Sequence, residues 1–187
     1  MEKYRPISLD RIKRYSLRDR ASIVDAGRVA ASPAREADIL AFVDSLPDIL
    51  AAGDLKAVIR AIAAARSRGR PVVLGMGGHP IKVGLTPVIV ELMERGIVTA
   101  VATNGSAIIH DFELAYMGHT SEDVAREIED GSFGMARETG VLLNEAITGG
   151  ADSGLGSAVG RMIASAGEAR RKELSIFARA YELSVPA

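Results

Sequence analysis

The sequence predicts an α/β fold that is rich in helix and contains a parallel sheet. Two short β-branched runs support this prediction: "RPVVLG" at 70–75 and "IVTAVATNG" at 97–105. The helical pattern "LTPVIVELMERG" lies between them, at 85–96. A strand, a helix and a second strand in this order form a parallel pair, because the right-handed crossover brings the chain back to the same end of the sheet.

The chain is divided by its patterning into an N-terminal arm, residues 1–32, and one domain, residues 33–187. The arm shows no sustained hydrophobic periodicity and has more basic than acidic residues. We therefore interpret it as a solvated or subunit-contacting segment. Its basic residues are Lys3, Arg5, Arg11, Lys13, Arg14, Arg18 and Arg20.

Two helices are predicted before the first strand. The first has Ser32 as its cap and Pro33 at its first position, and it bends or ends at Pro47. The second begins at Asp54 and ends at Gly69. Its alanine-rich surface is expected to pack on the flat strand that follows.

Helices are predicted for most of the chain after the second strand. "SEDVAREIEDG" at 121–131 has Thr120 or Ser121 as its cap, and "FGMARETGVLLNEAI" covers 133–147. The glycines of "GLGSAVG" at 154–160 have no preceding strand, so they favour close helix packing over a second nucleotide site. A last charged helix runs to about Leu183.

Composition restricts the class of protein. The 187 residues carry a net charge of −1, which provides no overall field for nucleic acid or an anionic membrane. The absence of cysteine excludes disulfides and thiolate chemistry. No apolar run is long enough to span a bilayer, and there is no signal-peptide core. We therefore expect a cytoplasmic protein that binds a small molecule rather than nucleic acid or a membrane.

Each predicted strand is followed by a glycine-rich loop. Gly75, Gly77, Gly78 and Gly84 belong to the first loop, and Asn104 and Gly105 to the second. Both loops should open at the carboxyl edge of the sheet, where parallel sheets bind ligands, and form the main pocket. The spacing is GxGG rather than GxGxxG, so a phosphate or nucleotide site and a tight structural turn both remain open.

Ionisable side chains accompany the loops. His79 and Lys82 lie within the first loop, and His110 follows the second, so all three are candidate acid, base or electrostatic groups. Asp111 and Glu113 come early in the helix after the second loop, where acids also complement the helix dipole. No second histidine stands at a strong ligand spacing, and no metal site is expected.

Two strands are few for a sheet that must cover helices on both faces. The sequence therefore looks like part of a larger sheet, either truncated at its C-terminal end or completed by another subunit.

Residues 72–115 resemble the nucleotide-binding part of the deoxyhypusine synthase family, above all its uncharacterised bacterial relatives. The resemblance follows "VVLGMGGHPIKVGLTPVIVELMERGIVTAVATNGSAIIHDFELA" and extends into the segments on either side. It implies a Rossmann-like fold that binds NAD and a homo-tetramer with sites at subunit interfaces. It also implies transferase and oxidoreductase chemistry directed at a polyamine or another amine.

The resemblance assigns the first and second loops to dinucleotide contacts, with Asp111 and Glu113 slightly later than the family's paired acids. The family's imine-forming lysine lies in a C-terminal motif that has no counterpart here, and Lys82 is not its equivalent. Two interpretations follow: an NAD-dependent, amine-directed enzyme, or a non-catalytic module that binds a nucleotide or a phosphorylated metabolite.

Overall fold

The structure is a computed structural model that describes residue 8 and residues 10–187. The chain forms two compact units, which divide at Arg60. Lys3 and Arg5 of the predicted basic arm lie outside the described residues. The other basic residues of the arm are exposed.

The first unit contains two helices, α1 (Ile39–Ser45) and the beginning of α2 (Leu50–Ser67), preceded by short 3-10 turns at Leu17–Asp19 and Ala26–Arg28. Lys56 of α2 is almost fully buried, and its ammonium donates to the carbonyls of Asp44 and Leu46 at 3.0 and 2.6 Å. Asp48 completes the set with an ion pair of 3.1 Å. Lys56 therefore caps the C-terminal end of α1 and holds the two helices together.

The predicted helix boundaries in this unit need correction. Helix α1 begins after Asp38, whose carboxylate accepts from the Ala41 N–H, and not after Ser32. Helix α2 begins at Leu50, four residues before the predicted start at Asp54. Its end after Ser67 is followed by Gly69 with φ +60°, as the stop signal predicted.

The second unit contains a parallel sheet of β1 (Val73–Gly75) and β2 (Ala100–Ala102), with Val73 opposite Ala100 and Gly75 opposite Ala102. The parallel α/β prediction is therefore confirmed at this level. On the other edge of β2, the Val101 N–H donates to the Pro186 carbonyl at 2.8 Å. Residues at the end of the sequence thus run beside β2.

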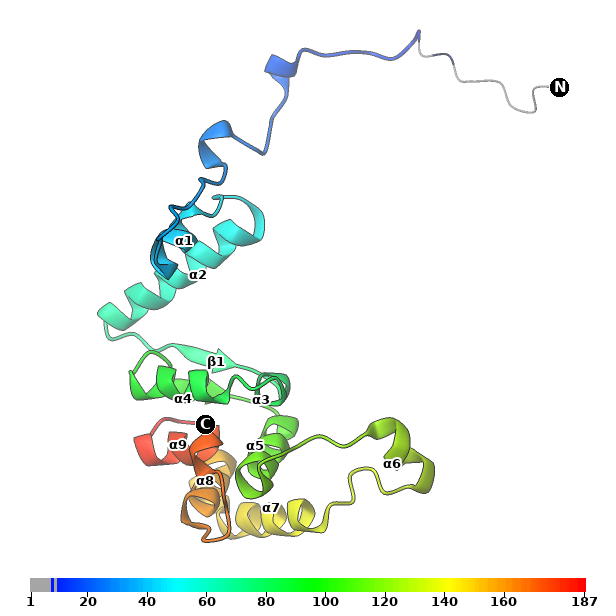
Figure 1. The fold of residues 1–187 in the computed structure, drawn as a ribbon, viewed down its shortest axis with the longest axis vertical. Coiled ribbons are helices and arrows are strands. Elements are labelled where there is room, and N and C mark those ends of the chain that lie inside the picture. Colours follow the sequence, from blue (N-terminus) through cyan, green and yellow to red (C-terminus); the bar gives the residue numbers. More distant parts are fainter. Residues whose placement is uncertain (1–7, 9) are drawn as a thin grey trace, which may run out of the picture. The chain divides into compact units, whose positions relative to one another are not determined.

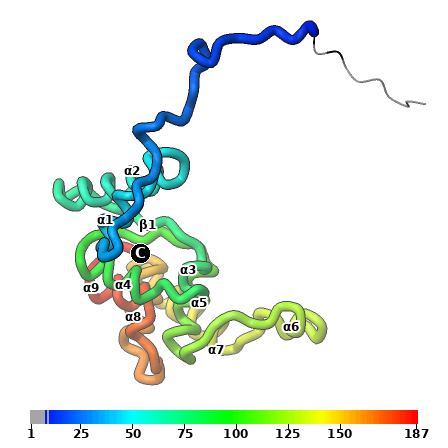
Figure 2. The backbone as a smooth tube through the Cα atoms, turned by 45° about the horizontal axis from the view of Figure 1, so that its top comes forward, coloured from blue at the N-terminus to red at the C-terminus, as the bar shows by residue number. Residues whose placement is uncertain are grey.

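Helices make up most of the second unit (Figure 1). They are α3 (His79–Lys82), α4 (Thr86–Glu94), α5 (Gly105–Met117), α6 (Val124–Asp130), α7 (Arg137–Gly149), α8 (Leu155–Ser165) and α9 (Ile176–Leu183). Short 3-10 turns cover Ala151–Ser153 and Lys172–Leu174. Figures 1 and 2 both show α6 standing out from α5 and α7, at the end of a long excursion of the chain.

Two hydrophobic clusters form the core of this unit. The first lies where β2, α3, α4 and α9 meet, and includes Ile81, Ile89, Val101 and Ile176. The second joins α5 to α7, α8 and α9 through Phe112, Leu143, Val159 and Phe177. Helix α5 contributes to both clusters, through Ala107 and Phe112 respectively. It is therefore held on two sides, and its N-terminus is fixed beside the sheet.

The glycines of residues 154–160 serve helix packing, as predicted. A Cβ atom at Gly160 would lie 2.3 Å from the Phe177 carbonyl oxygen, and one at Gly156 would lie 1.9 Å from that of Ala187. Only glycine allows α8 to approach α9 and the end of the chain this closely.

Two local predictions in this unit differ from the structure, and one buried hydroxyl in it lacks a partner in the part of the chain that the structure describes. The loop after β1 contains the single helical turn α3, which the sequence pattern did not indicate. Helix α6 is capped by Asp123, whose carboxylate accepts from the Arg126 N–H, and not by Thr120 or Ser121. Thr86 is the first residue of α4, and its buried hydroxyl has no hydrogen-bond partner among the described residues.

Candidate functional site

The two glycine loops lie side by side beyond the carboxyl ends of β1 and β2. We call residues 76–84 and 103–106 the loop edge. The Gly78 N–H donates to Ser106 Oγ at 3.2 Å, and the Ser106 hydroxyl donates to Asn104 Oδ1 at 2.7 Å. The prediction that both loops open at the same end of a parallel sheet is confirmed.

Gly78 is the position in the first loop where a side chain cannot be accommodated. A Cβ atom there would lie 2.6 Å from Cδ2 of His110 and 3.1 Å from the carbonyl oxygen of Ser106. The absence of a side chain lets the first loop rest directly on α5. By contrast, a Cβ atom at Gly77 would have only ordinary contact, 3.6 Å from Asn104 Nδ2.

Backbone N–H groups at the loop edge are free to bind an anion. Within the described part of the chain, the N–H groups of Gly77, His79, Gly105 and Ser106 have no hydrogen-bond partner. Gly105 and Ser106 begin the 13-residue helix α5, whose dipole favours negative charge at this end. The loop edge therefore suits the pyrophosphate of a dinucleotide.

The predicted site residues of the first loop occupy different positions at this edge. The side chains of His79 and Lys82 are exposed on the short turn α3. A Cβ atom at Gly75 would meet no neighbour, whereas Gly84 has φ +81° and serves the turn into α4. Lys82 lies near enough to His110 for its charge to lower the pKa of that imidazole.

His110 belongs to a chain of polar side chains that connects α5 to the segments following it. Its Nδ1 lies 2.8 Å from Thr120 Oγ1, and the Thr120 hydroxyl donates to Glu113 Oε2 at 2.6 Å. The other Glu113 oxygen accepts from the Thr139 hydroxyl at 3.0 Å. Burial is the main cause that lowers the pKa of His110, followed by Lys82, whereas Glu113 opposes the shift.

Asp111 does not belong to the loop edge. Its fully buried carboxylate accepts from Ser175 Oγ at 2.5 Å and from the Ile176 N–H at 2.7 Å. It therefore caps the N-terminus of α9. Burial raises its pKa to about 6, although the hydrogen bonds from Ser175, Ile176 and Phe177 oppose this shift. The Asp111 carboxylate therefore faces the core of the unit, while its assignment to a dinucleotide contact stays a prediction.

One cavity of the second unit lies away from the loop edge. A cavity of about 550 Å³ opens between the C-terminal half of α5, the segment that follows it, and the beginning of α7. The prediction that the glycine loops line the main pocket is therefore wrong. The loops bond to each other, and His110 packs against Gly78.

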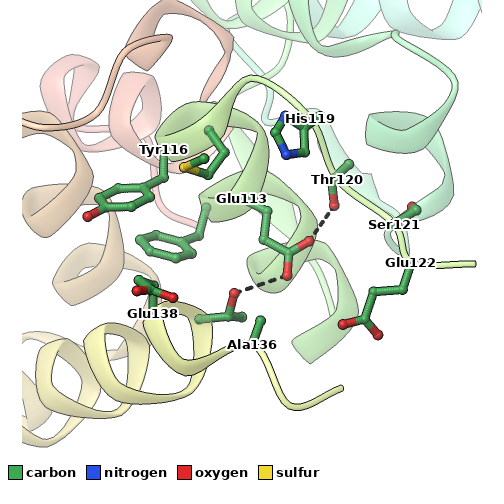
Figure 3. A pocket seen from close by; sticks show the side chains of 11 residues that line it. Glu113, Tyr116, His119, Thr120, Ser121, Glu122, Ala136 and Glu138 are labelled. Carbon is green, nitrogen blue, oxygen red and sulfur yellow. Dashed lines mark hydrogen bonds between the residues drawn. The ribbon is translucent and has the colours of Figure 1, made fainter. Parts of the chain in front are cut away.

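Three carboxylates line this cavity, from Glu113, Glu122 and Glu138, and that of Glu138 pairs with Arg137 at 3.1 Å. Figure 3 shows Glu113 reaching from α5 with its carboxylate held by two hydrogen bonds. One wall is aromatic, because the rings of Phe112 and Tyr116 stack with centroids 5.2 Å apart. The cavity is therefore acidic and partly apolar, which suits a cation with a hydrocarbon body.

Sequence reasoning missed most of this cavity. Glu122 and His119 are not among the predicted site residues, yet both line the cavity together with Thr120, Tyr116 and Thr139. The spacing of His110 and Glu113 on one helix face was the only local signal that pointed here. Thr139 lies 26 residues from Glu113, and no sequence pattern relates the two positions.

Among the described residues, no group of three or more histidine, aspartate or glutamate side chains could hold a metal ion. In the same part of the chain, no helix combines the length and apolar character that crossing a membrane requires. No protein-family model matches the sequence, and no curated protein does either.

Proposed function

We propose that this protein is a deoxyhypusine synthase-like protein of Rossmann-like fold that binds NAD at the loop edge and acts on an amine. The contact between the two loops supports this proposal most directly, because it brings the free N–H groups of Gly77 and Gly105 to one end of a parallel sheet. These groups fit the pyrophosphate. NAD would supply hydride-accepting chemistry when bound.

The acidic cavity supports the amine-directed part of the proposal. The carboxylates of Glu113 and Glu122 attract an ammonium group, and the Phe112 and Tyr116 rings offer an apolar surface to a carbon chain. Thr120 lines the cavity and also contacts His110, which rests on Gly78. The amine site and the loop edge are thus joined by a short path through packed side chains.

The nucleotide half of the proposal is tested by titrating NAD and ADP-ribose against wild type and three variants. Gly77→Ala should weaken binding by obstructing access to the N–H groups, while its ordinary contacts leave the fold intact. Lys82→Ala should also weaken binding by removing a nearby positive charge, an effect of about 1.5–3 kcal/mol if the lysine contacts phosphate. Gly140→Ala, in α7, is the matched control. If both loop variants bind NAD and ADP-ribose as tightly as wild type, the loop edge is a structural turn and not a nucleotide site.

A non-catalytic nucleotide- or phosphometabolite-binding module remains the second candidate function, because the loop edge alone could serve either. Absorbance at the wavelength of reduced nicotinamide separates the two. Growth of this signal after 1,4-diaminobutane is added to the NAD-loaded protein would support an enzyme. Binding of NAD without reduction by any amine supplied would support the module.

Self-association is part of the proposal, since the family resemblance implies a homo-tetramer. Apolar side chains on and beside α6 are exposed in the single chain, including Val124, Ile128, Phe133 and Met135. Light scattering on the full chain tests this directly. A monomer at all concentrations would contradict a tetramer with shared sites.

A further inference from the structure

The side chains of Glu113, Thr120 and His110 form a hydrogen-bonded series whose direction can be derived. Both Glu113 oxygens accept from a hydroxyl group, one from Thr120 at 2.6 Å and one from Thr139 at 3.0 Å. A carboxylate can only accept, so each threonine must be the donor in its bond. The direction of the first link is therefore settled by chemistry.

The second link follows from the number of hydrogens on Thr120. A hydroxyl carries one hydrogen, and that of Thr120 is directed at Glu113. Thr120 Oγ1 therefore offers only a lone pair to Nδ1 of His110, which lies 2.8 Å away. The imidazole must place its own hydrogen on Nδ1 to complete this bond.

The opposite edge of the imidazole lies toward the first glycine loop. Gly78 packs against Cδ2, the carbon bonded to Nε2, as the 2.6 Å distance of a hypothetical Cβ atom demonstrates. Nε2 itself has no hydrogen-bond partner among the described residues. Partial burial and the charge of Lys82 both disfavour a second proton on the ring, although Glu113 opposes them. The neutral ring, which carries a single hydrogen, is thus favoured.

We propose that Glu113 and Thr120 are positioning residues that hold His110 as the Nδ1–H tautomer, so that its bare Nε2 accepts a hydrogen bond from a ligand at the loop edge. The recognised group is an N–H, an O–H or an ammonium, because a ring nitrogen that carries only a lone pair can accept a hydrogen bond but cannot donate one. The ligand half rests on the proposed function, whereas the tautomer does not.

The tautomer is measured by long-range ¹H–¹⁵N correlation NMR of the full chain, with the His110 signals assigned through His110→Gln. Wild type should show the hydrogen on Nδ1. Thr120→Val removes the acceptor and should shift the population toward Nε2–H. Thr139→Val is the matched control, since it removes the other donor to Glu113 but leaves the contact between Thr120 and His110. A wild-type ring protonated on Nε2, or a tautomer unchanged in Thr120→Val, would overturn the proposal.

The ligand half is tested with two probes that carry opposite hydrogen-bonding groups. n-Butylammonium should shift the Nε2 signal of wild type, and inorganic sulfate, which carries no hydrogen at neutral pH, should leave it in place. Thr120→Val should bind n-butylammonium about 2- to 12-fold more weakly, the equivalent of one hydrogen bond of roughly 0.5–1.5 kcal/mol. A shift with sulfate alone, or with neither probe, would contradict Nε2 as a ligand acceptor. Parallel titration with NAD reports separately on the proposed function.

Discussion

The carboxylate of Asp111, on α5, accepts a hydrogen bond of 2.5 Å from the hydroxyl of Ser175, 64 residues later in the chain. The same hydroxyl accepts from the Ala178 N–H at 2.9 Å, so Ser175 is the N-cap of α9. Asp111 holds this cap in place by accepting the hydrogen of the Ser175 hydroxyl. The N–H groups of Ile176 and Phe177 also donate to Asp111. One acidic side chain thereby satisfies the first turn of a buried helix end.

Replacing Asp111 should destabilise the fold. Asp111→Asn turns one acceptor into an NH₂ group that faces N–H and O–H donors, and we expect a loss of about 1–3 kcal/mol in the free energy of unfolding. Urea denaturation at pH 7 measures it. Asp152→Asn, at an exposed position, is the control and should change stability by less than about 0.5 kcal/mol. Equal stability of the two variants would contradict the capping role.

Asp111 should also make stability depend on pH. Its pKa of about 6 in the folded chain exceeds the ordinary value of 3.8, so the folded state binds the proton more tightly. The resulting stabilisation is fully present below about pH 4 and is lost as the pH rises through 6. Its size is roughly 3 kcal/mol, from about 1.4 kcal/mol per pKa unit.

The comparison that isolates this effect is wild type against Asp111→Asn, by urea denaturation between pH 4 and 7. The difference in stability between them should be larger at pH 4 than at pH 7. If the asparagine variant fails to fold, the ¹³C carboxyl shift of Asp111 in wild type gives the pKa directly. A midpoint below pH 4 would refute the expectation.

Two glycine-to-alanine substitutions should have opposite effects. Gly160→Ala places a Cβ atom 2.3 Å from the Phe177 carbonyl oxygen, so α8 and α9 must separate, with an expected loss of about 1–3 kcal/mol. Gly140→Ala meets no atom within 4 Å and lies inside α7, so it should stabilise the fold by roughly 0.5–1 kcal/mol. Thermal unfolding of both variants tests the pair. A destabilised Gly140→Ala variant would indicate a contact that the single chain does not contain.

The charge of Lys82 should affect the titration of His110. Because Lys82 lowers the pKa of this histidine, Lys82→Ala should raise it, and Glu113→Gln should lower it further by removing the opposing charge. NMR titration of the imidazole Hε1 signal follows both shifts. Arg161→Ala, an exposed change on α8, is the control. Shifts in the same direction for Lys82→Ala and Glu113→Gln would show that something other than these two charges controls the ring.

Several features could be predicted because they depend on short stretches of chain. The β-branched runs around Val73 and Val101 form parallel strands. The helix between them connects the two strands by a crossover, which returns the chain to the same end of the sheet. Gly69 and Gly96 end helices with positive φ, as residues without a Cβ atom do most easily. The spacing of Gly156 and Gly160 correctly indicated helix packing, because a run of small residues on one face permits close approach.

Tertiary structure alone decided which polar groups meet. The sequence by itself determined that Asp111 and Glu113 lie near the start of one helix. In the folded protein, however, the two side chains have different neighbours. Asp111 points into the core toward Ser175, while Glu113 lines a cavity with Thr120 and Thr139. A hydrogen bond between residues distant in sequence requires its donor and acceptor atoms to lie within about 3 Å of each other. The packing of whole helices brings them to this distance. Local patterns contain no information about that final distance, and for this reason the acidic cavity was not predicted whereas the glycine loops were.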